Sequence, residues 1–196
     1  MKRCKKPSSM KILVILVGLL ATIYVADLLV QRTKSIVLQI FVANDDQNTF
    51  EAKKIEAELA DVFSIGNHER IIVDDSLYVV FDSSDPYVES SLAKIYAYMA
   101  AKELDVLIAP LAVVQHYTQG LPMLDYPTLL KDEPELLQHL QPYLIRTTSA
   151  DGQKNEYLLD LTQSRYSSSD AMYMAIPSSA PHLHAITNLL KYVFPL

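Results

Sequence analysis

Apolar residues spaced three or four positions apart predict amphipathic helices at three places in the chain. Asn48, with Glu51 three residues later, is close to a capping box and is expected to begin the first helix. Asp85 is a favourable N-cap for the second helix, and Pro86 suits its first position, where a missing N–H costs nothing. The three apolar stripes are Ala52, Ile55, Leu59 and Val62; Val88, Leu92, Ile95 and Met99; and Leu183, Ile186, Leu190 and Val193.

Short apolar runs predict buried strands. Residues 35–43 (SIVLQIFVA) and 104–109 (LDVLIA) are apolar on both sides, which is typical of the parallel sheet of an α/β fold. A new helix is expected after Pro110, with Gly120 just past its end. We therefore predict an α/β fold class, with a mostly parallel sheet and flanking helices. Further strands are predicted at 71–73 and 77–81, which form one bulged strand or a hairpin, and at 143–147, 156–161 and 171–176.

A longer apolar run, from Ile12 to Val30, precedes this domain and contains one charge, Asp27. A helix of this length nearly matches the hydrocarbon core of a bilayer, which is about 30 Å thick. Five basic residues precede the run and two follow it, so the positive-inside rule places the N-terminus in the cytoplasm. We expect a basic cytoplasmic tail (1–11), a transmembrane helix (12–30) that contacts the lipid bilayer, and an extracytoplasmic domain (35–196). The protein would then be a single-pass protein of the cell membrane, and a cleaved signal peptide is the competing interpretation.

Charge and composition exclude several classes of function. The whole chain has a net charge of −6, but residues 35–196 carry 10 basic and 22 acidic side chains, a net −12. Such an acidic domain repels phosphates, so we expect no nucleic acid as a partner. The one cysteine, Cys4, lies before the apolar run, which excludes an internal disulfide and zinc-ribbon or thioredoxin motifs. Four glycines are too few for phosphate- or dinucleotide-binding loops, and we expect no cofactor.

Polar residues that follow the predicted strands are the candidate ligand-binding site, because ligands of open α/β sheets bind outside the carboxyl ends of the strands. The alternative is that they only form caps and turns. Asp45, Asp46 and Asp82 would bind a hard cation if they converged, but the EF-hand pattern is absent and we predict no metal site. No G-x-S-x-G motif occurs, the histidines are scattered, and we predict no catalytic residues. The candidate ligand-binding residues are Asn44, Asp45, Asp46, Asp82, Ser83, Pro110, Ser178 and Ser179.

Three segments resemble the first lobe of the type II periplasmic-binding-protein fold, the fold of extracellular solute-binding proteins that serve bacterial transporters. They are the opening strand SIVLQIFVANDD, the central segment with Tyr117, Gly120, Leu121, Leu124 and Asp125, and the closing segment with Tyr173, Ile176, Ser178 and Ser179. Members of that family carry a second lobe inserted in the middle, whereas here the insert would be only about residues 125–170. The resemblance therefore implies a one-lobe relative, anchored by a helix, without the second lobe that would close a cleft around the ligand.

These observations predict a membrane-anchored extracytoplasmic domain that binds a small solute or peptide. Such a domain would serve as an accessory of an envelope transport system, with a membrane transport or envelope protein as its partner. The alternative is a non-enzymatic protein–protein interaction module of the cell envelope that has lost ligand binding. An enzyme is the third alternative. It ranks last because no catalytic group of residues is evident in the sequence.

Overall fold

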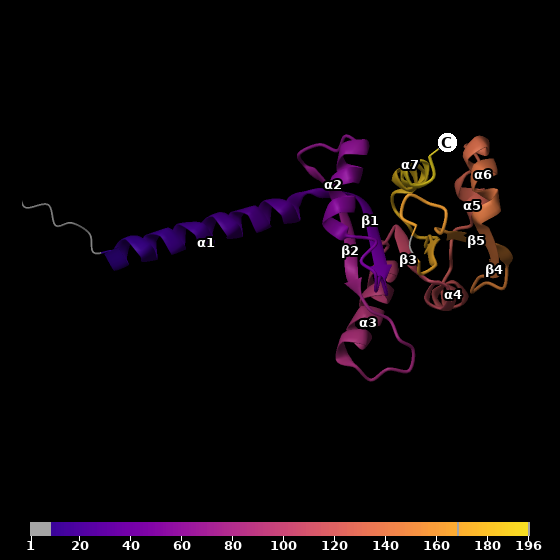
Figure 1. The fold of residues 1–196 in the computed structure, drawn as a ribbon, viewed down its shortest axis with the longest axis horizontal. Coiled ribbons are helices and arrows are strands. Elements are labelled where there is room, and N and C mark those ends of the chain that lie inside the picture. The colour runs from indigo at the N-terminus through magenta and orange to yellow at the C-terminus, as the bar shows by residue number, and fades with distance from the viewer. Residues whose placement is uncertain (1–8, 168, 196) are drawn as a thin grey trace, which may run out of the picture.

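A mixed sheet with helices on both faces forms the domain in the computed structural model, which describes residues 9–167 and 169–195 (Figure 1). The class is α/β, as predicted. In chain order the elements are α1 (Ser9–Thr33), β1 (Ser35–Ala43), α2 (Ala52–Val62), β2 (Glu69–Leu77), α3 (Pro86–Ala100), β3 (Val106–Pro110), α4 (Leu111–Gly120), α5 (Tyr126–Leu129), α6 (Pro134–Leu140), the 3-10 helix η1 (Gln141–Tyr143), β4 (Leu144–Thr148), β5 (Lys154–Asp160), β6 (Met172–Ala175) and α7 (Leu183–Val193).

The strand order in the described chain is β2-β1-β3-β6-β5-β4, so β2 and β4 form the two edges. β1 is parallel to both β2 and β3, as the buried runs predicted. The other neighbouring pairs, β3 with β6, β6 with β5 and β5 with β4, are antiparallel. The prediction of a mostly parallel sheet is therefore wrong for this half of the sheet.

The connections between strands explain this division. α2 lies between β1 and β2, and α3 lies between β2 and β3; a helical crossover returns the chain to the same end of the sheet and makes the next strand parallel. β4 and β5 are instead joined by a tight turn at residues 149–153, and β5 reaches β6 without a helix. Short links of this kind reverse the chain, so these strands are antiparallel.

Each face of the sheet has its own apolar core. One face of β1, with Leu38, Ile40 and Val42, packs with the buried side chains of α2, α5, α6 and α7. The other face, with Phe41 and Ala43, packs with the buried side chains of α3 and α4. Figure 1 shows these two helical layers on opposite sides of the strands. Burial on both faces accounts for the continuous apolar runs of β1 and β3.

Several predicted helix and strand ends are confirmed and others are wrong. Asp85 caps α3 by accepting a hydrogen bond from Tyr87 N at 2.7 Å, and Pro86 is its first residue, as predicted. Asn48 does not cap α2; it lies in a turn with φ 53°, and the N-cap is Glu51, whose side chain makes no cap bond. The strand predicted at 77–81 is also wrong, since β2 ends at Leu77. Gly120 is the last residue of α4 rather than the residue after it.

The long helix α1 extends away from the domain (Figure 1). Its described large apolar side chains, which lie between Leu13 and Val25, are all more than half exposed. Among the described residues, no helix meets the length and apolarity required to cross a membrane. Residues 1–8 of the predicted cytoplasmic tail lie outside the described residues, as do the side chains of residues 12, 15 and 26–30 in the predicted span.

Candidate functional site

The carboxyl ends of the three parallel strands meet at one end of the sheet, where most of the predicted site residues lie. Asn44 follows β1, and its side-chain amide holds the chain after β2 through two bonds. Asn44 Nδ2 donates to the Val79 carbonyl at 2.8 Å, and Val79 N donates to Asn44 Oδ1 at 2.6 Å. Asn44 also has φ 57°, a left-handed conformation that asparagine tolerates better than most residues. The Asn44 side chain is therefore engaged in joining two loops.

The neighbouring residues are occupied in a similar way or point into solvent. Asp45 accepts hydrogen bonds from Thr49 N at 2.9 Å and Phe50 N at 2.6 Å, which fixes the loop before α2. Ser83 accepts from Asp85 N at 3.1 Å, just before α3. Asp46 and Asp82 are exposed. Asn44, Asp45 and Ser83 thus act as the caps and turns that the sequence left open as an alternative.

Pro110 ends β3 at this same end of the sheet, but Ser178 and Ser179 do not join it. They follow β6, which runs antiparallel to β3, so Ala175 pairs with Leu107 near the beginning of β3. Ser179 Oγ donates to the Met99 carbonyl at 3.3 Å, at the end of α3. The placement expected for these two serines is wrong, because the sequence pattern did not reveal the direction of β6.

A buried carboxylate that sequence reasoning missed lies at this opposite end. Asp105, which is fully buried, accepts hydrogen bonds from Gln39 N at 2.7 Å and His182 N at 2.9 Å, and its Oδ2 lies 2.9 Å from His182 Nδ1. An Asp–His pair can serve a hydrolase, but in the described residues no serine or cysteine is bonded to His182. The pair joins β1, the start of β3 and the start of α7. Its signal in the sequence was Asp105 itself, one charge inside an apolar run.

The outer edge of β2 differs from these strand ends because the N–H and C=O groups of every second residue face away from the sheet. Val73 N donates outward to Glu56 Oε1 of α2 at 3.0 Å. Since successive residues of a strand direct their N–H and C=O groups to alternate sides, Ile71 faces outward as well. Asp75 accepts from Ala52 N at 2.8 Å and so provides the cap of α2 that Asn48 was expected to provide. Two carboxylates therefore tie α2 to β2.

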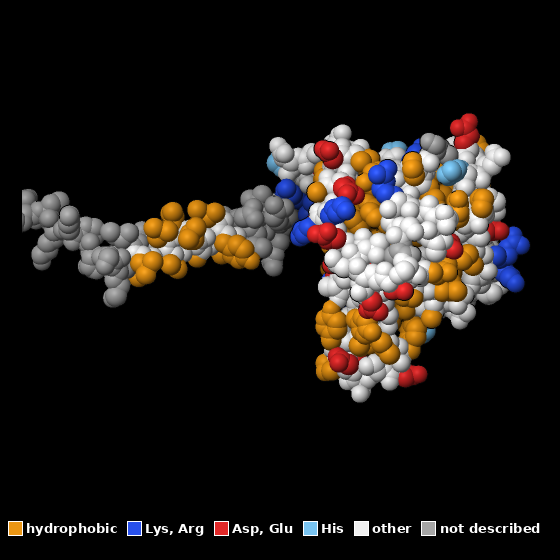
Figure 2. Space-filling model, viewed as in Figure 1, with side chains coloured by type: hydrophobic (Ala, Val, Ile, Leu, Met, Phe, Trp, Pro, Cys, Tyr) orange, Lys and Arg blue, Asp and Glu red, His pale blue; other side chains and the backbone are white. Residues whose placement is uncertain are grey.

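A groove with a volume of about 770 Å³ runs along this edge. Its walls are residues 69–74 of β2 and residues Lys53, Glu56, Ala57 and Ala60 of α2, with Lys34 just before β1. The volume falls within the range of about 300–1,000 Å³ that is typical of ligand pockets. Figure 2 shows basic and acidic side chains gathered where α1 meets the domain, the region that contains Lys34. None of the eight predicted ligand-binding residues lines the groove.

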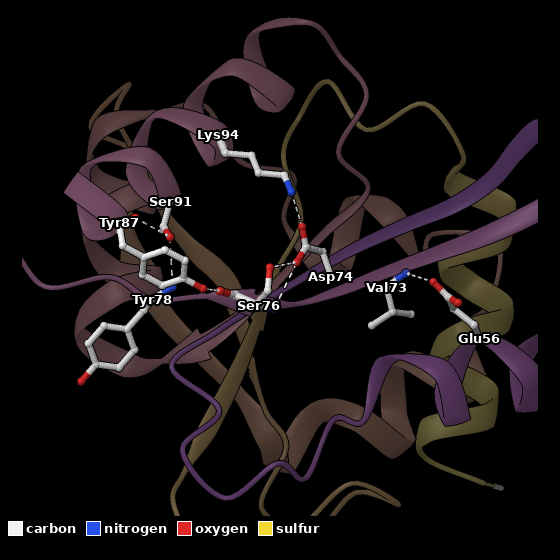
Figure 3. A network of polar contacts seen from close by, with 8 residues as sticks. All are labelled: Glu56, Val73, Asp74, Ser76, Tyr78, Tyr87, Ser91 and Lys94. Carbon is white, nitrogen blue, oxygen red and sulfur yellow. Dashed lines mark hydrogen bonds and ion pairs between the residues drawn. The ribbon is translucent and has the colours of Figure 1, made fainter. Parts of the chain in front are cut away.

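A polar network fixes β2 to α3 next to the groove (Figure 3). Lys94 of α3 forms an ion pair with Asp74, which also accepts from Ser76 Oγ at 2.6 Å and Ser76 N at 3.1 Å. Partial burial alone would raise the pKa of Asp74, but the hydrogen bonds from Lys94 and Ser76 outweigh it and hold the pKa below its usual 3.8. Asp74 is therefore an ionised, fully engaged carboxylate at neutral pH.

Exposed aromatic residues extend the same side of the domain beyond the end of β2. Tyr78, Val80 and Tyr87 are 41%, 42% and 55% exposed. Tyr87 donates its hydroxyl to the Ser76 carbonyl, and Tyr78 N donates to Ser91 Oγ at 3.2 Å (Figure 3). Tyrosine is enriched among the residues that contribute most to protein–protein binding. We refer to Tyr78, Val80 and Tyr87 as the tyrosine patch.

The sequence did contain a signal for an edge strand at β2. The strand ERIIVDDSL includes Glu69, Arg70, Asp74 and Asp75, and charged residues are a common protection of edge strands against uncontrolled pairing. No three His, Cys, Asp or Glu side chains of the described residues converge in a way that would hold a metal ion.

Comparisons with family models, curated proteins and solved structures found no match to this chain. The resemblance to one lobe of a periplasmic binding protein therefore stays a prediction from the sequence.

Proposed function

We propose that this protein is a membrane-anchored, extracytoplasmic binding domain whose ligand is a peptide segment, taken up along the free edge of β2. The observation that carries this proposal is the open groove beside β2, an edge strand that has no neighbouring strand on its outer side in the described chain. Extended peptides commonly bind to such edges by adding a strand to the sheet, with backbone hydrogen bonds giving affinity and side-chain contacts giving specificity. A peptide is favoured over a small solute because Asn44 and Asp45 are engaged in internal bonds.

The proposed anchor is α1, with the N-terminus in the cytoplasm. The exposed apolar side chains of α1 and the basic residues around it support this arrangement. The membrane prediction is tested by alkaline extraction of membranes from cells that express the full chain. We expect the protein to stay in the membrane pellet and the domain to be cleaved by protease added outside; release into the supernatant would contradict the anchor.

Peptide binding is tested with the full chain in detergent micelles. A displayed library of random peptides is selected on the protein, and selected peptides, amino acids and sugars are compared by their effect on the melting temperature. A ligand that binds the folded state must raise this temperature by mass action. We expect a dose-dependent rise with selected peptides only. A rise with a small solute alone, or no selected peptide at all, would contradict the proposal.

A protein–protein interaction module of the cell envelope is the second candidate function, and the tyrosine patch favours it. The patch lies beyond the end of β2, so a folded partner would contact it without entering the groove. In either case, the proposed setting is an envelope assembly such as a transport system, in which the domain is an accessory with the fold of one solute-binding lobe.

A further inference from the structure

We propose that the peptide bound at the β2 edge carries an acidic side chain that pairs with Arg70. This inference rests on the proposed function and specifies the chemistry of the ligand. Three independent features of the groove support it: the state of its charges, the surroundings of Arg70 and the carboxylate that already occupies the edge.

Two of the three carboxylates of the groove are neutralised within the chain. Glu56 forms an ion pair with Lys53 at 2.9 Å, and Asp74 forms an ion pair with Lys94. Glu69 accepts a hydrogen bond from Gly66 N at 2.8 Å. The cations are not all matched in this way, because Lys34 and Arg70 have no ion-pair partner among the described residues. Glu69 has no ion-pair partner there either, so two unpaired cations stand against one unpaired carboxylate, and the unneutralised charge of the groove is a single positive one, although the domain as a whole is acidic.

Arg70 is the more constrained of the two cations. Its Nε is buried and, in the described chain, has no hydrogen-bond partner. Gln39 Oε1, on the neighbouring strand β1, is buried and unpartnered as well. An amide oxygen can accept one hydrogen bond from Arg70, but it cannot neutralise the guanidinium charge. A carboxylate does both, since a guanidinium presents several donors in a geometry that matches its two oxygens.

The chain itself shows that an anion is accepted at this edge. The outward N–H of Val73 is satisfied by the Glu56 carboxylate, which lies over the edge of β2. A peptide that pairs with β2 must offer its own carbonyl to Val73 and displace Glu56, which remains close to Lys53. An arriving strand with an acidic side chain near Arg70 replaces the lost carboxylate interaction with a new one, while a basic side chain would leave the Arg70 charge unpaired.

The test uses the full chain in detergent micelles and fluorescein-labelled peptides of nine residues, the length of β2. The peptides alternate valine and threonine and carry glutamate, glutamine or lysine at the central position. We expect the glutamate peptide to bind about tenfold more tightly than the glutamine peptide, and the lysine peptide to bind most weakly, as measured by fluorescence polarisation. Arg70→Gln should abolish the preference for glutamate. Lys154→Gln, an equal change of charge on β5, should preserve it.

A second measurement leaves the protein unchanged and tests strand pairing directly. The glutamate peptide is N-methylated on alternate amides in two patterns; the pattern that blocks the N–H groups facing β2 should abolish binding, and the other should retain it. Equal binding of the three peptides would overturn the acidic preference and leave the proposed function standing. Failure of every peptide to bind would overturn both. A protein that is dimeric in light scattering without peptide, and monomeric as Val73→Pro, would show that the edge is filled by a second copy instead.

Discussion

The carboxyl ends of the parallel strands and the edge of β2 differ in how far their polar groups are satisfied within the chain. At the strand ends, Asn44 and Asp45 direct their side-chain oxygens and nitrogens to backbone groups of the same chain. Along the edge, the outward N–H of Val73 is bonded only to the side chain of Glu56, and Arg70, which lines the groove, has a buried nitrogen without a partner in the described residues. Polar residue types alone therefore do not distinguish a binding surface from a structural cap. Hydrogen-bond donors without partners and charges without a counter-charge do.

The largest effect is expected from the buried carboxylate of Asp105. Asp105→Ala leaves two backbone N–H groups and His182 without their acceptor, and we expect the free energy of unfolding to fall by about 3–5 kcal/mol. Chemical denaturation of the full chain in detergent measures this. Asp105→Asn, which keeps the shape and one acceptor oxygen, should lose less; an equal loss in the two variants would contradict a role based on these hydrogen bonds.

Asn44→Ala tests whether the strand-end residues are structural. The substitution removes both bonds to Val79 and places alanine at a positive φ, so we expect a loss of about 3 kcal/mol in the free energy of unfolding. Asn44→Gly removes the same bonds without the conformational strain, and should lose about 1 kcal/mol less than Asn44→Ala. Neither variant should change peptide affinity. If a folded variant bound the peptide tenfold more weakly, the binding site would lie at the carboxyl ends of the strands instead.

The pH dependence of stability tests the network that fixes β2 to α3. The pKa of Asp74 in the folded protein lies below its usual value of 3.8, so the unfolded chain takes up the proton first as pH falls. The stabilisation by Asp74 is therefore complete above pH 3.8 and is lost as pH falls through the folded value. We expect the melting temperature of the native protein to fall more steeply than that of Asp74→Asn in this acidic range. Parallel curves would mean that the bonds from Lys94 and Ser76 do not favour the ionised form of Asp74.

The smallest effect is expected at Glu56, which covers one backbone group of the edge. Glu56→Ala should strengthen binding of the glutamate peptide by about three- to tenfold, because the peptide no longer has to displace a carboxylate from Val73 N, a bond of about 1 kcal/mol. Glu51→Ala, on the residue that precedes α2, is the matched control and should leave affinity unchanged. Weaker binding in Glu56→Ala would show that Glu56 contacts the ligand.

Local signals predicted the elements well and their arrangement only in part. The cap at Asp85 and the apolar runs of β1 and β3 identified helices, strands and a parallel pair, because these signals depend on neighbours in the sequence. The direction of β6 depends on the length of the connection before it and on pairing with distant strands, which periodicity does not encode. The error at Ser178 and Ser179 follows from this.

The candidate site was harder to predict because its groups are largely backbone. Residue types drew attention to Asn44 and Asp45, whereas the N–H of Val73 has no signature in the sequence. The charges within ERIIVDDSL indicated an edge strand, but only the three-dimensional arrangement shows that Arg70 lacks an anionic partner in the described residues while Glu56 and Asp74 have cationic ones.

Amide hydrogen exchange of the full chain, followed by NMR with and without the glutamate peptide, tests the central claim most directly. The account predicts that the peptide slows exchange at the outward amide of Ile71 in β2, because this amide becomes bonded to an added strand, whereas Val73 N already has Glu56 as its acceptor. It predicts no change in the loops around Asn44 and Asp82. Protection confined to those loops, with β2 unaffected, would contradict the account and place the binding site at the carboxyl ends of the strands.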